Sequence, residues 1–256
     1  MIEPLLCAID FETSGLDSSE DEIIEMGWAI FTPTRILSLH NYLIKPEKKV
    51  SPLIEDLTGL TNNDLETYGL SPSVVLTTFI GDLYYSSHPR PQYYVGHNFR
   101  SFDSKFLSRY VEDYFKEIKN PEDQEIKKKI LNTEIIDTLT DMPYPETMKQ
   151  MKLKYLALDH GYVNNNAHRA LFDCLACVHI VQQYSFESII NLRTDELVLV
   201  EANCEKPWHD GGTSKDWAKS NGFRFNSDLK VWRKEMRKSQ FENLLTNSPI
   251  NLEVIQ

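Results

Sequence analysis

Residues 5–16, LLCAIDFETSGL, decide the fold of this chain because they join a short apolar run to a pair of acids. Residues 5–9 are apolar and end at the first acid, which is typical of a central strand. Asp10 and Glu12 lie two residues apart, so in a strand their side chains share one face and can bind one cation. The sequence therefore predicts a sheet whose carboxyl edge presents carboxylates to a metal ion.

The flanking sequence predicts an α/β domain with a mixed sheet. Two β-rich runs, residues 22–31 and 36–44, are joined through Thr32-Pro33-Thr34, which indicates antiparallel pairing. Ser71 followed by Pro72 predicts the start of a helix, and residues 93–96 predict a fourth strand. Apolar side chains then recur every four residues from Phe102 to Ile118, as on one face of a helix.

The next part of the chain is expected to contain an exposed excursion and two helices. Residues 119–129, KNPEDQEIKKK, are charged and carry a proline, so they predict an exposed excursion before a strand at 134–139. We interpret Lys127–Lys129 as a solvated face rather than a phosphate contact. Helices are predicted at 148–160, ending at Gly161, and at 168–184.

Two further clusters supply the remaining candidate catalytic residues. Asp103 lies in GHNFRSFDSKFL, and His168 and Asp173 lie in HRALFDCLA. Carboxylates crowded on one surface stay ionised only if cations neutralise them, so four converging acids indicate hard metal ions. The alternative, that these acids are merely solvated or cap helices, does not explain their grouping. The set predicts metal-assisted phosphodiester hydrolysis by two ions about 3.5–4 Å apart.

The spacing of the third cluster restricts where its histidine lies. His168 and Asp173 are five residues apart, so His168 must lie at the helix entrance or in the preceding loop if both reach one site. The run Asn164-Asn165-Asn166 is interpreted as a flexible lead-in that lets the imidazole approach a water molecule.

Taken in order, the three clusters resemble the motifs of the DEDDh branch of the DnaQ-like 3′–5′ exonucleases, over roughly residues 5–185. The DxET motif matches Asp10, Glu12 and Thr13; the HN and aromatic-Asp motif matches His97, Asn98, Phe102 and Asp103; the HxxxxD motif matches His168 and Asp173. Three residues separate Asn98 from Phe102 where many members have two, a spacing also found in exonuclease I relatives. Thr58-Gly59-Leu60-Thr61 resembles the family's GIT segment.

This resemblance implies a ribonuclease H-like mixed five-stranded sheet flanked by helices, and it implies roles for single residues. Asp10, Glu12, Asp103 and Asp173 would hold two Mg²⁺ or Mn²⁺ ions, and His168 would deprotonate the attacking water. Thr13 and Leu16 would lie near the terminal nucleotide, and Asn98 and Phe102 near the penultimate one. For Leu16 and Phe102, ordinary core packing is an equal alternative. His97 is expected to be structural.

The charge distribution separates the C-terminal part from the rest. The 256 residues carry a net charge of −11, but residues 206–240 are net +5 and the remainder is net −16. We therefore predict an exonuclease domain over 1–190 and a small basic, Trp-rich α+β domain over 195–256. Its AK-x-x-Gly pattern resembles a small domain often appended to nucleic-acid enzymes. Six cations are candidate phosphate contacts: Lys215, Lys219, Arg224, Lys230, Arg233 and Lys234.

Aromatic residues and cysteines have structural interpretations. Trp208, Trp217, Phe225 and Trp232 are expected to form the core of the small domain rather than to stack on bases. Four scattered cysteines suit a reducing compartment, and Cys174 and Cys177 are interpreted as small buried helix residues rather than zinc ligands. No apolar run approaches the roughly 20 residues that span a bilayer, and residues 1–10 do not resemble a signal peptide. A cytoplasmic protein that does not contact membrane is expected.

These observations favour a 3′–5′ exonuclease that acts on single-stranded nucleic acid, with DNA favoured over RNA. An exoribonuclease of the same chemistry is the main alternative, because nothing in the five catalytic residues recognises a 2′-hydroxyl. A nucleic-acid-binding protein without catalysis is less favoured, since the catalytic set is intact. The sequence leaves a homodimer open.

Overall fold

The computed structural model describes residues 3–85, 89–145, 148 and 150–255. The chain forms two compact units, one of Met1–Leu139 with Lys152–Phe186 and one of Thr140–Met151 with Glu187–Gln256. The second unit therefore includes a segment from the middle of the chain. The predicted domain boundaries, 1–190 and 195–256, stay a prediction.

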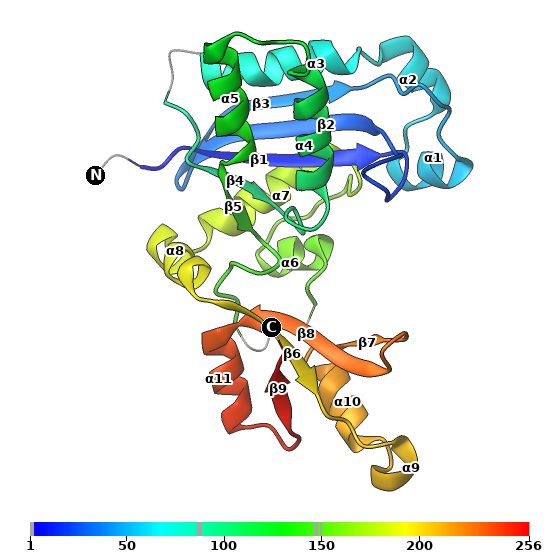
Figure 1. Cartoon of the computed structure of the whole chain (residues 1–256), viewed down its shortest axis with the longest axis vertical. Helices are drawn as coiled ribbons and strands as arrows, with labels where there is room; N and C mark the ends of the chain where they lie inside the picture. The colour runs from blue at the N-terminus through cyan, green and yellow to red at the C-terminus, as the bar shows by residue number, and fades with distance from the viewer. Residues whose placement is uncertain (1–2, 86–88, 146–147, 149, 256) are drawn as a thin grey trace. The chain divides into compact units, whose positions relative to one another are not determined.

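The first unit contains a mixed five-stranded sheet in the order β3-β2-β1-β4-β5 (Figure 1). Its strands are β1 (Leu6–Thr13), β2 (Ile23–Thr32), β3 (Arg35–Leu43), β4 (Tyr93–Gly96) and β5 (Glu134–Asp137). β1 pairs antiparallel with β2 and parallel with β4, so it is central, as the sequence predicts. β2 and β3 pair antiparallel, and β4 and β5 pair parallel.

The first unit has several helices, and α1 and α2 begin at residues whose side chains cap them. They are α1 (Pro52–Thr58), α2 (Asn62–Tyr68), α3 (Pro72–Ile80) with the π-helical turn η1 (Gly81–Tyr85), α4 (Asp103–Tyr114), α5 (Pro121–Leu131), α6 (Leu153–Asp159) and α7 (Ala170–Gln182). The side chain of Ser51 accepts a hydrogen bond from the N–H of Ile54 at the start of α1. Thr61 and Asp64 form a capping box at the start of α2.

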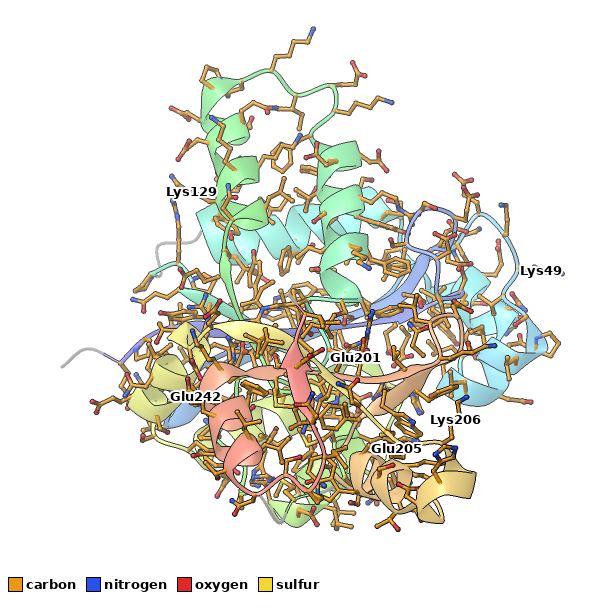
Figure 2. All side chains as sticks on the ribbon, turned by 60° about the horizontal axis from the view of Figure 1, so that its bottom comes forward. Lys49, Lys129, Glu201, Glu205, Lys206 and Glu242 are labelled. Atoms are coloured by element: carbon orange, nitrogen blue, oxygen red, sulfur yellow. The ribbon has the colours of Figure 1, made fainter. Side chains whose placement is uncertain are left out.

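Helix α5 occupies most of residues 119–129, which the sequence predicted only as an exposed excursion. Asn120 accepts a hydrogen bond from the N–H of Glu122, and Pro121 occupies the first turn, so the proline starts the helix instead of breaking it. Ile126 and Ile130, one turn apart, are buried. Lys129 (Figure 2) is partly exposed on this helix, and its Nζ lies 3.3 Å from Oε1 of the exposed Glu125, which agrees with a solvated face.

The two faces of β1 differ in character. Cys7, Ile9 and Phe11 point into the main core together with residues of α3, α4 and α5. Asp10 and Glu12 alternate with them and so lie on the opposite face. Helix α7 packs on β1 and β2 (Figure 1), and a Cβ on Gly27 of β2 would lie 2.6 Å from the backbone N of Leu171. The acids of β1 therefore share a face with α7.

The second unit contains a four-stranded antiparallel sheet in the order β7-β8-β6-β9. Its strands are β6 (Leu197–Ala202), β7 (Arg224–Asn226), β8 (Val231–Arg237) and β9 (Leu252–Val254), and its helices are α8 (Phe186–Thr194), α9 (Pro207–Asp210), α10 (Thr213–Ser220) and α11 (Lys238–Thr246). Residue Phe186 of α8 belongs to the first unit. The mixed sheet with its helices and the second sheet confirm the predicted fold class.

The core of the second unit differs in one residue from the prediction. Trp217 and Trp232 pack against buried residues such as Val200 and Met236, as expected. Phe225 does not: it lies on the edge strand β7 and is 52% exposed, whereas Phe223 takes the buried position. The predicted core residue Trp208 has a side chain outside the described residues.

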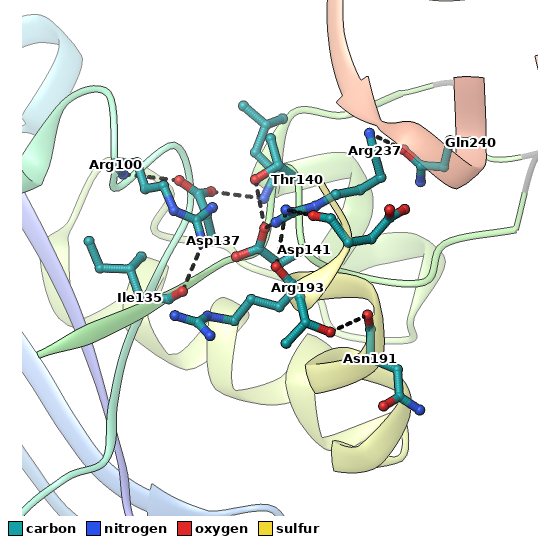
Figure 3. A network of polar contacts seen from close by, with 12 residues as sticks. Arg100, Ile135, Asp137, Thr140, Asp141, Asn191, Arg193, Arg237 and Gln240 are labelled. Carbon is teal, nitrogen blue, oxygen red and sulfur yellow. Dashed lines mark hydrogen bonds and ion pairs between the residues drawn. The ribbon is translucent and has the colours of Figure 1, made fainter. Parts of the chain in front are cut away.

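A buried ion pair attaches Thr140–Met151 to the rest of the second unit (Figure 3). The guanidinium of Arg237 pairs with the carboxylate of Asp141, and both side chains are almost fully buried. Arg237 also donates to the backbone carbonyls of Arg193 at 3.1 Å and Asp195 at 2.7 Å. Removing either charge would leave the other unpaired in the interior, which is strongly unfavourable.

Across the described residues, no helix combines the length and the apolar character that crossing a membrane requires. The four cysteines are free. Cys174 and Cys177 are buried on α7, as expected for packing residues, and the thiol of Cys174 donates to the carbonyl of Gly27 at 3.3 Å.

Candidate active site

The first acidic motif lies at the carboxyl end of the central strand. Asp10 and Glu12 of β1 are paired in register with Gly27 and Glu25 of β2. Glu12 is buried and Asp10 is partly buried. The two carboxylates therefore meet at the face of the sheet that α7 covers, as their spacing predicts.

Asp103, from the second motif, is the first residue of α4 and is buried. Its Oδ1 accepts a hydrogen bond from the backbone N–H of Phe11 at 3.2 Å, which brings the start of α4 against the end of β1. The preceding turn is held by Asp137 at the end of β5, which accepts from the N–H groups of Asn98 at 2.8 Å and Arg100 at 3.0 Å (Figure 3).

The third motif lies at the start of α7. Asp173 is in the first turn, and its carboxylate accepts from Asn164 Nδ2 at 2.6 Å and from the N–H of His168 at 3.1 Å. His168 lies in the loop before the helix, is exposed and has φ = 66°, as its spacing from Asp173 requires. Asn164 differs from the expected flexible lead-in, because it is buried and anchors Asp173.

The three motifs converge on one point. Ligand atoms of Glu12, His168 and Asp173 all lie within 4.8 Å of one another. Asp10 and Asp103 lie outside this closest group but are electrostatically linked to it. The charge of Asp103 raises the pKa of Glu12, and the charges of Asp103, Asp173 and Glu12 raise the pKa of Asp10. The structure therefore brings together all five residues that the sequence singled out.

Burial and mutual repulsion raise the pKa values of the four carboxyls. Burial, followed by the charges of Asp173 and Glu25, raises the pKa of Glu12 to about 8. Burial raises the pKa of Asp103 to about 8, against the lowering effect of backbone N–H groups. The pKa values of Asp10 and Asp173 are also raised, in both cases mainly by burial. Such a set is unfavourable when ionised and unpaired, so it suits divalent cations.

The residues predicted to contact substrate divide into two groups. Leu16 and Phe102 line one pocket of about 390 Å³. Leu16 is 86% exposed, which argues against core packing, while Phe102 is half-buried and its ring lies 5.2 Å from that of Phe106. Asn98 is exposed in a left-handed conformation. Thr13 is buried, and its hydroxyl donates to the carbonyl of Gly15 at 2.6 Å.

Sequence reasoning missed several residues around the site. Ser101 and Lys105 line the same pocket as Leu16. Asn164, Asp137 and Glu25 each hold a backbone or side-chain group of a motif. Asp137 could have been found, because it ends a strand that lies parallel to β4, which in turn lies parallel to β1.

His97 and the basic residues of the second unit have identifiable surroundings. His97 Nδ1 lies 3.0 Å from the hydroxyl of Thr138, in line with the structural role expected of it. Arg233 pairs with Glu201 at 2.9 Å, and Lys234 donates to the carbonyl of Asn221 at 3.0 Å. The other four candidate phosphate contacts are exposed: Lys215, Lys219, Arg224 and Lys230.

Comparison with known proteins identifies relatives over most of the first unit. A family model described as exonuclease, of the RNase T family, matches residues 7–181. The 3′-5′ exonuclease DinG of Staphylococcus saprophyticus is 27% identical over 212 residues, 82% of this chain and 21% of that protein. The DNA polymerase III subunit epsilon of Treponema pallidum is 28% identical over 176 residues, 68% of this chain and 73% of that protein.

A solved structure shares the fold. E. coli exonuclease I, in complex with a dA16 oligonucleotide, has a TM-score of 0.59 and 15% identity, covering 78% of this chain and 48% of that chain. The chain thus spans about a fifth of the DinG relative and about half of exonuclease I. The family model covers the positions of all five converging residues, and the chain therefore belongs to the RNase T, or DnaQ-like, family of 3′–5′ exonucleases.

Proposed function

We propose that this chain is a metal-dependent 3′–5′ exonuclease that releases nucleoside 5′-monophosphates from single-stranded DNA. The observation that carries the proposal is the convergence of four carboxylates from three separate motifs beside an exposed imidazole. Membership of the exonuclease family agrees with it.

The four carboxylates fit a pair of divalent cations. Asp10, Glu12, Asp103 and Asp173 would hold two Mg²⁺ or Mn²⁺ ions, because these acids are buried together and their mutual repulsion needs positive charge. When bound, such ions stabilise negative charge on the phosphate and on the departing 3′-oxygen. One crystal structure of the E. coli exonuclease I complex with single-stranded DNA is a zinc-ion-bound form.

His168 is the candidate general base. Its imidazole is exposed, and one of its nitrogens lies within 4.8 Å of carboxylate oxygens of Glu12 and Asp173. It can accept a proton from a water molecule that attacks the terminal phosphodiester, and pass it to solvent. Asp173 holds the backbone of His168 while its other oxygen is anchored by Asn164.

The pocket that contains Leu16 and Phe102, the residue before Asp103, is the proposed binding place for the 3′ end. Leu16 and Phe102 offer apolar surface for the faces of the last bases, and Lys105 and Ser101 of the same pocket can contact phosphate. Asn98 is exposed and is proposed to donate to a sugar or base, whereas the hydroxyl of Thr13 donates within its own turn. The complex of exonuclease I with dA16 supports single-stranded DNA as the substrate.

The exposed cations of the second unit, with Arg233 and Lys234, are proposed to contact phosphates of the strand. The net charge of +5 in residues 206–240 favours this, because an acidic first unit repels nucleic acid. Acids also occur in this part of the chain, and Glu205 lies beside Lys206 (Figure 2). The free cysteines agree with a reducing, intracellular location.

A digestion assay tests the proposal. Labelled DNA and RNA of one sequence, each single- and double-stranded, are incubated with the protein and Mg²⁺ or Mn²⁺, and released mononucleotides are measured. We expect mononucleotides from single-stranded DNA, no release in chelator, and no release by Asp10→Ala. Faster digestion of RNA would instead assign an exoribonuclease, and equal activity of Asp10→Ala would show a contaminating nuclease and contradict the proposal.

A further inference from the structure

Glu25 is a buried carboxylate that the proposed mechanism does not use. It lies on β2 directly opposite Glu12 of β1, and its side chain is 0% exposed. A negative charge buried near Asp10, Glu12 and Asp173 is unfavourable unless it is paired. The partners of Glu25 therefore indicate what it does.

These partners lie mainly at the start of α7. Arg169 donates to Glu25 through Nε, at 3.0 and 3.1 Å to the two oxygens, and through Nη2 at 2.7 Å. The backbone N–H of Ala170, the first residue of α7, donates at 3.0 Å. Asn41 Nδ2 donates from β3 at 2.8 Å. Glu25 thus caps α7 and holds the residue that directly follows His168.

The backbone around His168 is fixed on both sides. On one side, the N–H of His168 donates to Asp173 at 3.1 Å. On the other, Arg169 has an extended backbone, with φ = −131° and ψ = 119°, and is tied to Glu25. The left-handed backbone of His168, which would relax in a free loop, is therefore held by its neighbours.

We infer that Glu25 and Arg169 are positioning residues that hold the imidazole of His168 at the reacting centre. This inference rests on the proposed function. Buried ion pairs add little net stability compared with apolar packing, whereas a displacement of about 1 Å at a catalytic group can lower a rate by about 10²-fold. A substitution that keeps the charge but changes the geometry of the pair should therefore affect the rate most.

A double-mutant cycle tests the inference on a short single-stranded DNA with saturating Mn²⁺. Arg169→Lys keeps the charge but loses the bidentate geometry. We expect it to lower kcat by about 10–100-fold with little change in KM, as for other residues that orient catalytic groups. In a His168→Ala background the same substitution should change kcat by less than about twofold, because the group that it positions is absent.

Two further variants test the other partner of the pair and control for a general loss of stability. Glu25→Gln still accepts from Ala170 but lacks the charge that pairs with Arg169, so it should lower kcat when His168 is present and change it little in the His168→Ala background. Arg237→Lys is the stability control: it weakens a buried ion pair in the second unit, so it should lower the melting temperature and leave kcat on a dinucleotide unchanged.

The possible failures are distinguishable. Equal losses from Arg169→Lys with and without His168 would overturn the inference, because a merely structural role predicts them, while the proposed function would stand. A wild-type protein that releases no mononucleotides would overturn the proposed function and the inference together.

Discussion

His168 has φ = 66°, a backbone conformation that glycine adopts readily and other residues rarely do. The strain of such a residue is of order 1–3 kcal/mol, and it is tolerated where function requires the side chain. The imidazole is exposed, so packing does not explain its presence. The conformation of this one residue is therefore independent support for a catalytic role.

This strain leads to a prediction for two variants that both lack the imidazole. His168→Ala and His168→Gly should each lower kcat by about 10²–10⁴-fold, the usual contribution of a general base. His168→Gly should nevertheless be more stable than His168→Ala by about 1 kcal/mol, because glycine relieves the strain. Chemical denaturation of both variants measures the difference. A less stable glycine variant would contradict the strained backbone.

The raised pKa values of the carboxyls predict how stability depends on pH. Glu12 ordinarily titrates near 4.5, and its pKa in the fold is about 8. A pKa that is higher in the folded state favours folding at low pH, and this contribution is lost as pH rises through the folded value. The melting temperature in chelator should therefore fall between about pH 5 and pH 8, and divalent cations should raise it most at the higher pH.

Replacing one of the acids by a neutral residue tests whether repulsion among the carboxylates lowers the melting temperature at high pH. At pH 8 in chelator, Asp10→Asn should melt above the wild type, although it is inactive, and should respond less to Mn²⁺. Glu66→Gln, which removes an exposed acid on α2, is the matched control and should not change the melting temperature. If stability in chelator increased with pH, the mutual repulsion of the site would be disproved.

At the scale of elements, the contact between β2 and α7 places Asp173 beside the acids of β1. A Cβ on Gly27 would lie 2.6 Å from the N of Leu171 and 2.7 Å from the carbonyl carbon of Ala170, whereas one on Gly81 would meet nothing within 4 Å. Gly27→Ala should therefore destabilise the protein by about 1–3 kcal/mol and lower kcat, since it displaces α7. Gly81→Ala, at an ordinary helical conformation, should be neutral or stabilising by about 0.4–1 kcal/mol. Thermal denaturation and the digestion rate measure both, and equal effects of the two substitutions would contradict this packing.

Some elements of the fold could be predicted from the sequence and others could not. The central strand and its acids could be predicted, because an apolar run followed by alternate carboxylates allows few other arrangements. Helix α5 could not: its charges and Pro121 suggested a loop, and its two buried residues, Ile126 and Ile130, are too few for a strong periodic signal. Glu25 could not be recognised either, because its partner Arg169 lies 144 residues away.

At the scale of the whole molecule, the asymmetry of charge predicts the salt dependence of binding. Replacing Lys215, Lys219, Arg224 and Lys230 by Gln should weaken binding of a long single strand. It should also reduce the slope of log K against log salt concentration by about 0.7 for each phosphate that the variant no longer neutralises. Turnover of a dinucleotide should be unchanged. Lys49→Gln with Lys129→Gln, which removes one exposed and one partly exposed cation of the first unit, is the control. An unchanged slope would contradict binding by the second unit.

Because Thr140–Met151 belongs to the second unit, truncating the chain after the first unit removes only part of the second unit. A stop codon near residue 190 would not yield a clean catalytic fragment, because Asp141 would be left without the guanidinium of Arg237 that neutralises it. Conversely, a single protease nick at that point should give two polypeptides that still copurify. The second unit takes one segment from the middle of the chain and one from its C-terminal part. A chimera that exchanges this unit between relatives must therefore replace both segments.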